Sequence, residues 1–260
     1  MENELVSIIT PMYNGAKYVA ETIDSVIAQT YKDWEMLIVN DGSKDNGPEI
    51  VEEYAKKDGR IRLINQENGG SANARNHGIR EAKGRYIALL DSDDVWEPTL
   101  LEEQLKFMKE KKTGLVFASY NRIDENSKPI LNTLKCKPVV TEKMMLVRNY
   151  VGAPLTAIYD SNVGGKIYLH EELRSIRDDY AYFIDVMKAV KIGYGNNKAL
   201  AKYRIFPNST TGNKRKLIKL QYRFYRDYLH LPVIRSLYNT IVWGVAGFFN
   251  FGASLKLLKK

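Results

Sequence analysis

The chain has 260 residues, of which 44% are hydrophobic and 27% are charged, which indicates one large globular domain, with or without appendages, and excludes disorder throughout or a polytopic membrane fold. The single cysteine, Cys136, excludes a disulfide framework, and the three histidines are too widely spaced to form a zinc site. The first residues contain acidic side chains and no apolar run long enough for a signal peptide, so we expect a cytoplasmic protein.

The net charge of +8 is concentrated near the end of the chain. Residues 198–260 contain 13 basic residues and one acidic residue, Asp227, whereas the rest of the chain contains 26 basic and 30 acidic residues. The last quarter of the chain is therefore expected to face an anionic surface, either lipid headgroups or nucleic acid.

Short β-branched runs alternate with helical periodicity from residue 5 to about residue 120. The predicted strands are 5–10, 36–39, 61–64, 86–90 and 115–119. The predicted helices are 18–27, about 48–54, 71–82 and 98–112. This alternation implies an α/β fold with a Rossmann-like, mainly parallel sheet and helices on both faces. Residues 120–170 have scattered glycines and prolines and favour mixed strand and loop.

Every conspicuous polar cluster in this region follows one of the predicted strands. The clusters are 11–14, Asp41, 68–70 and 91–94. Because ligands bind at the carboxyl ends of the strands in such sheets, we expect these clusters to converge. The first turn lacks the spaced glycines of a dinucleotide fingerprint, which disfavours a dinucleotide-binding enzyme. Asp41 is suited to hold a ribose hydroxyl or a base edge, and an Asx-turn is the equally weighted alternative.

The acidic cluster at 91–94 is the strongest local signal. Three carboxylates directly after a buried strand repel one another, and a divalent cation such as Mg²⁺ or Mn²⁺ would offset that cost. Asp93 is the favoured ligand, with Asp91 beside it. A helix cap is the alternative for Asp94, because Asp94 and Glu97 have capping-box spacing ahead of Pro98.

Four segments in order resemble the successive motifs of family 2 glycosyltransferases with the GT-A fold. They are VSIITPMYN at 6–14, VNDGS at 39–43, NGGSANARNHG at 68–78 and LDSDD at 90–94. The resemblance implies that the donor is bound by Thr10, Pro11, Tyr13, Asn14, Asp41, Gly70, Arg75, Asp91 and Ser92. It also implies that Asp93 binds a Mn²⁺ or Mg²⁺ ion that bridges the donor diphosphate. The alternatives are a structural ion pair for Arg75 and a turn with close helix packing for the glycines and alanines of 68–78.

Two later segments resemble the family more loosely, at 177–183 and 203–214. The first implies that Asp179 is the catalytic base, and it departs from the family pattern because Asp178 stands where a Glu is usual. The alternative is that both acids only complement the dipole of a helix start. The second segment implies that Arg204 contacts the donor diphosphate, with ordinary loop solvation as the alternative.

The end of the chain predicts a basic amphipathic helix. Lys216, Lys219, Arg223 and Arg226 recur at helical spacing, and an apolar stripe of Leu217, Leu220, Phe224 and Tyr228 lies beside them. The apolar run at 241–249, which offers Trp243, Phe248 and Phe249, is too short to span a bilayer, so we expect it to lie at a membrane surface. Packing on the body of the protein is the alternative.

Together these features predict a GT-A domain at 1–213, with a nucleotide-sugar-binding half at 1–120 and an acceptor-binding half at 121–213, followed by a tail at 214–260. The expected activity is inverting, metal-dependent transfer from a nucleotide-sugar, a UDP-sugar, to an acceptor hydroxyl. The expected acceptor is a saccharide, lipid-linked, in surface polysaccharide synthesis, and the expected location is the inner face of the plasma membrane, without a nucleic acid partner. A two-metal nucleic-acid-processing enzyme and a non-catalytic membrane-associated adaptor are the alternatives.

Overall fold

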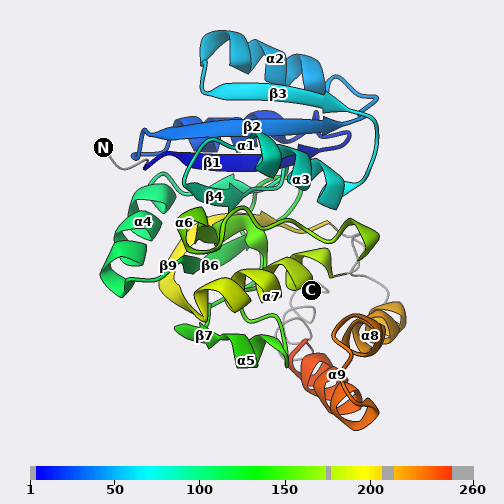
Figure 1. The fold of residues 1–260 in the computed structure, drawn as a ribbon. Coiled ribbons are helices and arrows are strands. Elements are labelled where there is room, and N and C mark those ends of the chain that lie inside the picture. Colours follow the sequence, from blue (N-terminus) through cyan, green and yellow to red (C-terminus); the bar gives the residue numbers. More distant parts are fainter. Residues whose placement is uncertain (1–3, 174–176, 207–213, 248–260) are drawn as a thin grey trace.

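One mixed sheet of nine strands organises the part of the chain that the computed structural model describes, residues 4–173, 177–206 and 214–247 (Figure 1). The strands are β1 Val6–Met12, β2 Trp34–Asp41, β3 Ile61–Gln66, β4 Tyr86–Leu89, β5 Val95–Trp96, β6 Leu115–Ile123, β7 Val139–Thr141, β8 Ile158–Asp160 and β9 Ile192–Arg204. Their order in the sheet is β3-β2-β1-β4-β8-β6-β9-β5, and β7 pairs with β9.

The first half of the sheet is parallel, as the alternation of the sequence predicts. β3, β2, β1 and β4 pair in parallel register, and β1, β2 and β4 are buried almost throughout. β1 continues two residues beyond the predicted end, to Met12, and β2 also continues two residues, to Asp41. Pro11 and Asp41 therefore belong to the strands themselves, whereas the sequence predicts them in the turns that follow.

The second half of the sheet mixes directions. β8, from the region 120–170 that the sequence leaves as mixed strand and loop, pairs antiparallel with both β4 and β6. β9 pairs parallel to β6 and antiparallel to β5 and β7. The expected α/β class is confirmed, with its parallel order confined mostly to the first four strands.

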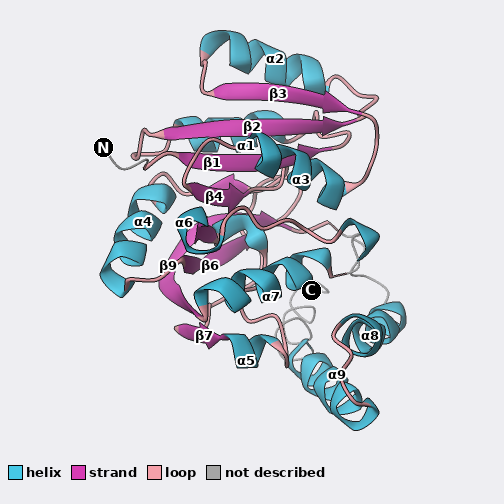
Figure 2. Ribbon diagram, viewed as in Figure 1, coloured by secondary structure: helices cyan, strands magenta, loops and turns pink. Residues whose placement is uncertain are grey.

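Helices cover both faces of the sheet, as predicted (Figure 2). The longer helices are α1 Val19–Ile27, α2 Gly47–Lys57, α3 Ser71–Glu81, α4 Leu100–Lys111, α7 Asp178–Val190, α8 Lys214–Arg223 and α9 Val233–Gly247, and the short ones are α5 Glu142–Met145 and α6 Ser161–Gly164. The strand residues alternate between two cores: Ile8 belongs to the core that includes residues of α1, α2 and α4, and Ile9 belongs to the core that includes residues of α3, α5 and α7.

The beginning of the tail packs on the body of the protein. A π-helical turn, Phe224–Tyr228, follows α8 and buries Phe224 and Tyr225, and the Phe224 ring stacks on Tyr180 of α7 with centroids 4.8 Å apart. The packing alternative is therefore confirmed for this segment. The boundary predicted at residue 213, like Phe248 and Phe249, lies outside the described residues. No helix in the described part of the chain is long and apolar enough to cross a membrane.

Candidate active site

A hollow of about 240 Å³ opens at the carboxyl ends of β1, β2 and β4. It is lined by Pro11, Met12, Tyr13, Asp41, Ser71, Arg75, Asp91, Ser92 and Asp93. Seven of these residues are predicted donor or metal ligands, so the convergence predicted from strand order is confirmed for them. The Tyr13 side chain is exposed at this opening.

Asp41 is fixed by the backbone of the loop before α3. Its carboxylate oxygens accept hydrogen bonds from the Gly69 N–H at 2.7 Å and the Gly70 N–H at 2.9 Å. Gly70 has φ +88°, a conformation that L side chains rarely adopt, so the turn that meets Asp41 needs glycine there. Gly70 does not line the hollow; it holds Asp41. The Asx-turn alternative falls to the preceding residue, because the Asn40 side-chain oxygen accepts from the Ser43 N–H at 2.9 Å.

Arg75 connects the acidic turn after β4 to the start of α7. The side chain is buried, and its Nη2 lies 2.5 Å from Asp91 Oδ1 while its Nη1 lies 3.7 Å from Asp178 Oδ2. Arg75 thus lines the hollow and also forms the structural ion pair that the sequence analysis weighed against a binding role. This ion pair brings the first turn of α7 to the edge of the hollow.

Asp93 is the half-buried carboxylate at the floor of the acidic turn. Burial, together with the neighbouring charge of Asp91, raises the pKa of Asp93 to about 6. The two carboxylates therefore favour a bound proton or a cation between them. Within the described residues, no group of three or more His, Cys, Asp or Glu side chains is placed to hold a metal ion. Any cation held here would need ligands from a bound molecule or water.

Asp94 does not cap a helix, contrary to the alternative that the sequence offers. α4 begins at Leu100 with Thr99 at its N-cap. Asp94 is buried instead, and its Oδ1 accepts a hydrogen bond from the Arg204 N–H at 2.9 Å. Burial and the charges of Asp93 and Asp91 raise the pKa of Asp94. Asp94 therefore anchors β9 to the acidic turn.

Asp179 lies in the first turn of α7, as predicted, directly after Asp178. Arg177 precedes the helix with φ +64°, which turns the chain sharply into α7. Burial and the adjacent Asp178 raise the pKa of Asp179. A carboxylate with a raised pKa is a stronger base, which suits proton abstraction from a hydroxyl.

Arg204 does not line the hollow, and its guanidinium is already paired. Its side chain is fully buried, and Nη2 forms an ion pair with Glu21 at 2.6 Å while Nε donates to the Asp93 carbonyl at 2.7 Å. The guanidinium also lies over the Tyr18 ring, 4.5 Å from the centroid. Arg204 supports the back of the acidic turn, so its predicted diphosphate contact is corrected to a structural role.

Two further predicted donor residues lie outside the lining of the hollow. Thr10 is wholly buried within β1, because both faces of this strand are covered. Asn14 bridges two loops: its N–H donates to Ser43 Oγ at 2.9 Å, and its side-chain oxygen accepts from the Lys44 N–H at 2.8 Å. Both residues shape the strand and turn that carry Pro11 and Tyr13.

Comparison with known proteins assigns this arrangement to a family. The model of Glycosyl transferase family 2 matches residues 7–163, more than half of the chain. The chain belongs to this family. TuaG of Bacillus subtilis, named as a teichuronic acid biosynthesis glycosyltransferase, is 36% identical over 89% of this chain and 91% of its own. WfgD of Escherichia coli, named UDP-Glc:alpha-D-GlcNAc-diphosphoundecaprenol beta-1,3-glucosyltransferase, is 33% identical over 94% and 95%.

Solved structures of other glycosyltransferases share the fold. TarS of S. aureus in complex with UDP-GlcNAc has a TM-score of 0.71 and 20% identity, covering 94% of this chain and 72% of its own. The mannosyltransferase PcManGT of Pyrobaculum calidifontis, in complex with GDP-Man and Mn²⁺, has a TM-score of 0.63 and 17% identity, covering 100% and 79%. The expected GT-A type fold is confirmed, and the chain is a glycosyltransferase.

Several residues that shape the site of this glycosyltransferase escaped sequence reasoning. Met12 and Ser71 line the hollow, and only their positions beside predicted residues could have indicated them. Glu171 was not predicted either. Its carboxylate accepts from Asn73 Nδ2 and Asn76 Nδ2, both at 2.8 Å, and so braces α3 from a segment nearly 100 residues later. The two asparagines on one helix face were the available signal.

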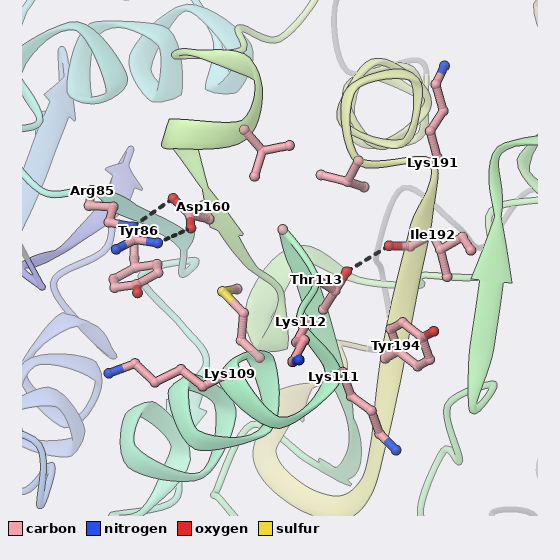
Figure 3. A pocket seen from close by; sticks show the side chains of 14 residues that line it. Arg85, Tyr86, Lys109, Lys111, Lys112, Thr113, Asp160, Lys191, Ile192 and Tyr194 are labelled. Carbon is pink, nitrogen blue, oxygen red and sulfur yellow. Dashed lines mark hydrogen bonds and ion pairs between the residues drawn. The ribbon is translucent and has the colours of Figure 1, made fainter.

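A second and larger hollow lies away from the glycosyltransferase site. It measures about 520 Å³ and opens at the opposite edge of the sheet, where β4 and β9 begin (Figure 3). Several basic side chains surround it, but Arg85 pairs with Asp160 at 2.7 Å and Lys191 pairs with Glu142 at 3.0 Å. The carboxyl ends of the parallel strands, where the family motifs gather, remain the candidate active site.

Proposed function

We propose that this glycosyltransferase moves a sugar from a UDP-sugar to a hydroxyl of a lipid-linked saccharide, with inversion at the anomeric carbon. One observation supports this most strongly: a single hollow combines a nucleoside-sized cleft beside Tyr13 and Asp41 with the carboxylate pair of Asp91 and Asp93. Such a combination suits a nucleoside diphosphate, whose base and ribose need polar contacts and whose phosphates would need a divalent cation to lie beside the carboxylates.

The donor assignment draws on both the hollow and the relatives. Tyr13 offers an exposed aromatic face for a base, and Asp41 lies beside it with its carboxylate already oriented by Gly69 and Gly70. TarS is described with UDP-GlcNAc, and WfgD is named for UDP-Glc. We therefore infer that the donor is a UDP-sugar.

The carboxylates present fit a divalent cation, Mn²⁺ or Mg²⁺. Asp93 carries a pKa raised to about 6 by burial and by Asp91, which is the electrostatic strain that a cation relieves. Asp93 would be the protein ligand. Bound there, the cation would supply Lewis-acid stabilisation of the charge on the departing nucleoside diphosphate. Arg75 balances Asp91 from the other side and keeps the turn in place.

Asp179 is proposed to remove the proton from the acceptor hydroxyl. Its position supports this proposal, because Asp179 lies on the first turn of α7, which the Arg75–Asp178 ion pair ties to the edge of the hollow. In the proposed reaction the acceptor hydroxyl displaces the nucleoside diphosphate from the anomeric carbon in a single step, so the configuration inverts. The raised pKa of Asp179 favours proton transfer.

The acceptor class is inferred from the relatives. WfgD is named for a diphosphoundecaprenol-linked GlcNAc acceptor, and TuaG is named for teichuronic acid biosynthesis. We infer a lipid-linked saccharide acceptor for this chain also. Family membership makes the adaptor and nucleic-acid-processing alternatives unnecessary, since it identifies a transferase.

The proposal is tested by nucleotide release. The full-length protein is incubated with UDP-, GDP- and dTDP-activated sugars, Mn²⁺ or Mg²⁺, and a polyprenyl-diphosphate-linked GlcNAc. We expect acceptor-dependent release of UDP that stops in excess EDTA. Turnover unaffected by EDTA would refute the metal, and turnover only with GDP- or dTDP-sugars would refute the donor base. Asp33→Asn, an exposed acid far from the hollow at the opposite end of β2, is the matched control.

A further inference from the structure

Helix α9 presents its apolar side outward and its polar side to the protein. Its outward residues have exposed fractions between 50% and 83% and are Ile234, Leu237, Tyr238, Ile241 and Val245. These five positions recur at three- and four-residue spacing, so they form one continuous stripe along the helix. We call them the α9 stripe. The inward residues Ser236, Asn239 and Thr240 are buried and polar.

The orientation of α9 is fixed by specific contacts of its inward side. Asn239 Nδ2 donates to the Leu146 carbonyl, outside the helix, at 2.9 Å. The Thr240 hydroxyl is satisfied within the helix, where it donates to the Ser236 carbonyl at 2.7 Å. Trp243, further along the same side, has its ring 4.8 Å from the Arg177 guanidinium. These contacts hold the helix in the rotation that exposes the stripe.

This arrangement reverses the usual pattern for a helix on a globular protein. Such helices place their apolar stripe against the core, whereas α9 satisfies the core with small polar groups and leaves large side chains in water. A continuous exposed apolar surface of this kind marks a site of contact with another molecule or a membrane. The apolar stripe predicted from the sequence at 217–228 is unavailable for this role at Phe224, which is buried.

The length of α9 and the basic charge around it indicate that the α9 stripe contacts an anionic bilayer. The described helix α9 has 15 residues and is therefore about 22 Å long, less than the roughly 30 Å of a hydrocarbon core, so its described residues suit the interface and are too few to cross the core. Arg235 of α9 and Lys219 of the neighbouring α8 are both exposed basic residues. Residues 198–260 carry 13 basic residues against one acid, so anionic headgroups attract this region.

The same charge argues against a second copy of the chain. In a symmetric dimer through the α9 stripe, two strongly basic tails would face each other, and like charges across an interface oppose association. A lipid surface can bury the apolar stripe and also attract the basic residues around it.

We propose that the α9 stripe is a membrane-docking surface that inserts among the lipids of an anionic bilayer. Because Trp243 covers Arg177, two residues before Asp179, docking through the outward side of α9 holds the start of α7 near the lipid surface. An acceptor carried on a lipid would then meet the catalytic base without leaving the membrane. The docking of α9 is independent of the proposed chemistry. The delivery of a lipid-linked acceptor to Asp179 rests on the proposed function.

The first test is sedimentation with phosphatidylcholine vesicles that contain or lack phosphatidylglycerol. Ile234→Ser with Ile241→Ser removes the two most exposed side chains of the stripe without changing charge. We expect the partition coefficient on phosphatidylglycerol vesicles to fall by about tenfold or more. The matched control, Val163→Ser with Ile192→Ser, changes two exposed apolar residues elsewhere and should bind as the wild type does. Equal binding by both double variants would overturn the proposal.

The second test reports insertion directly. Trp34 and Trp96 are buried, and Trp243 lies on the inward side of α9, so a new tryptophan in the stripe can be distinguished. We expect Tyr238→Trp to add fluorescence that brominated lipids quench, and Tyr168→Trp, on the exposed surface elsewhere, to escape quenching. Absence of quenching would overturn the proposal. So would a dimer that forms without lipid and is lost in the serine double variant, because it would identify the partner of the stripe as a second protein chain.

Discussion

Replacing Arg204 by Met tests whether this residue supports the acidic turn or binds the donor. Methionine keeps much of the aliphatic volume but loses the cation and every hydrogen bond. In the structure the Arg204 side chain is fully buried and donates to Glu21 at 2.6 Å, to the Asp93 carbonyl at 2.7 Å and to Ser127 Oγ at 2.9 Å. The substitution therefore leaves several acceptors without their donor.

The expected destabilisation can be estimated from these partners. Glu21 is 42% exposed and can return to water, so its ion pair contributes about 1 kcal/mol or less. The Asp93 and Asp124 carbonyls lose a charged donor in a partly buried setting, at about 1–3 kcal/mol each. The total is about 2–7 kcal/mol, which at about 2–4 °C per kcal/mol for a chain of this size lowers the melting temperature by roughly 4–28 °C.

Thermal unfolding of the Arg204→Met protein measures this effect. Lys202→Met is the matched control, because Lys202 lies on the same strand, is partly exposed and pairs with Glu97 at only 3.4 Å. The control should lose less than about 1 kcal/mol. An Arg204→Met protein as stable as the control, with a raised KM for the donor, would refute the structural role and restore the diphosphate contact.

Three further predictions concern the ionisable groups. Asp179→Asn should lower kcat by about 10²-fold or more with little change in donor affinity, and a retained kcat would place the base elsewhere. Because the pKa of Asp93 is raised to about 6, protons should compete with Mn²⁺ below that pH, so metal-dependent donor affinity measured by titration should fall about tenfold per pH unit well below it. Burial by itself lowers the pKa of His170, but hydrogen bonds with Asp185 and Glu172 outweigh it and raise the pKa. The raised pKa stabilises the fold below about pH 6.5 and ceases to do so as pH rises through the folded value, so His170→Asn should cost more in urea unfolding at about pH 5 than at about pH 9.

The sequence predicted the part of the site that depends on strand order. Pro11, Asp41 and Asp91 each follow an apolar run, and parallel pairing alone brings the ends of such runs together. The first half of the chain is therefore enough to predict that these three residues converge. A structural ion pair for Arg75 is also an alternative that the sequence offers, but its partners, Asp91 and Asp178, come from the structure.

Long-range partners explain what the sequence could not predict. Arg204 meets Glu21, 183 residues earlier, and neither residue type nor spacing indicates that pairing. β8 enters the sheet from a region without clear periodicity, so its antiparallel position between β4 and β6 was not foreseeable. The sequence predicts only an apolar run at 241–249 in this region, whereas the outward rotation of α9 is decided by Asn239 and Trp243, whose contacts are tertiary.

Calorimetric titration of UDP in the presence of Mn²⁺ tests the central claim, that a cation on Asp93 holds the donor while Asp179 acts only on the acceptor. The titration compares wild type, Asp93→Asn, Asp179→Asn and the control Asp33→Asn, each with and without EDTA. We expect wild type, Asp179→Asn and Asp33→Asn to bind UDP with equal affinity. We expect Asp93→Asn to lose about tenfold or more in UDP affinity, and EDTA to cause the same loss in the wild type. Wild-type affinity in Asp93→Asn with Mn²⁺ present would contradict the central claim.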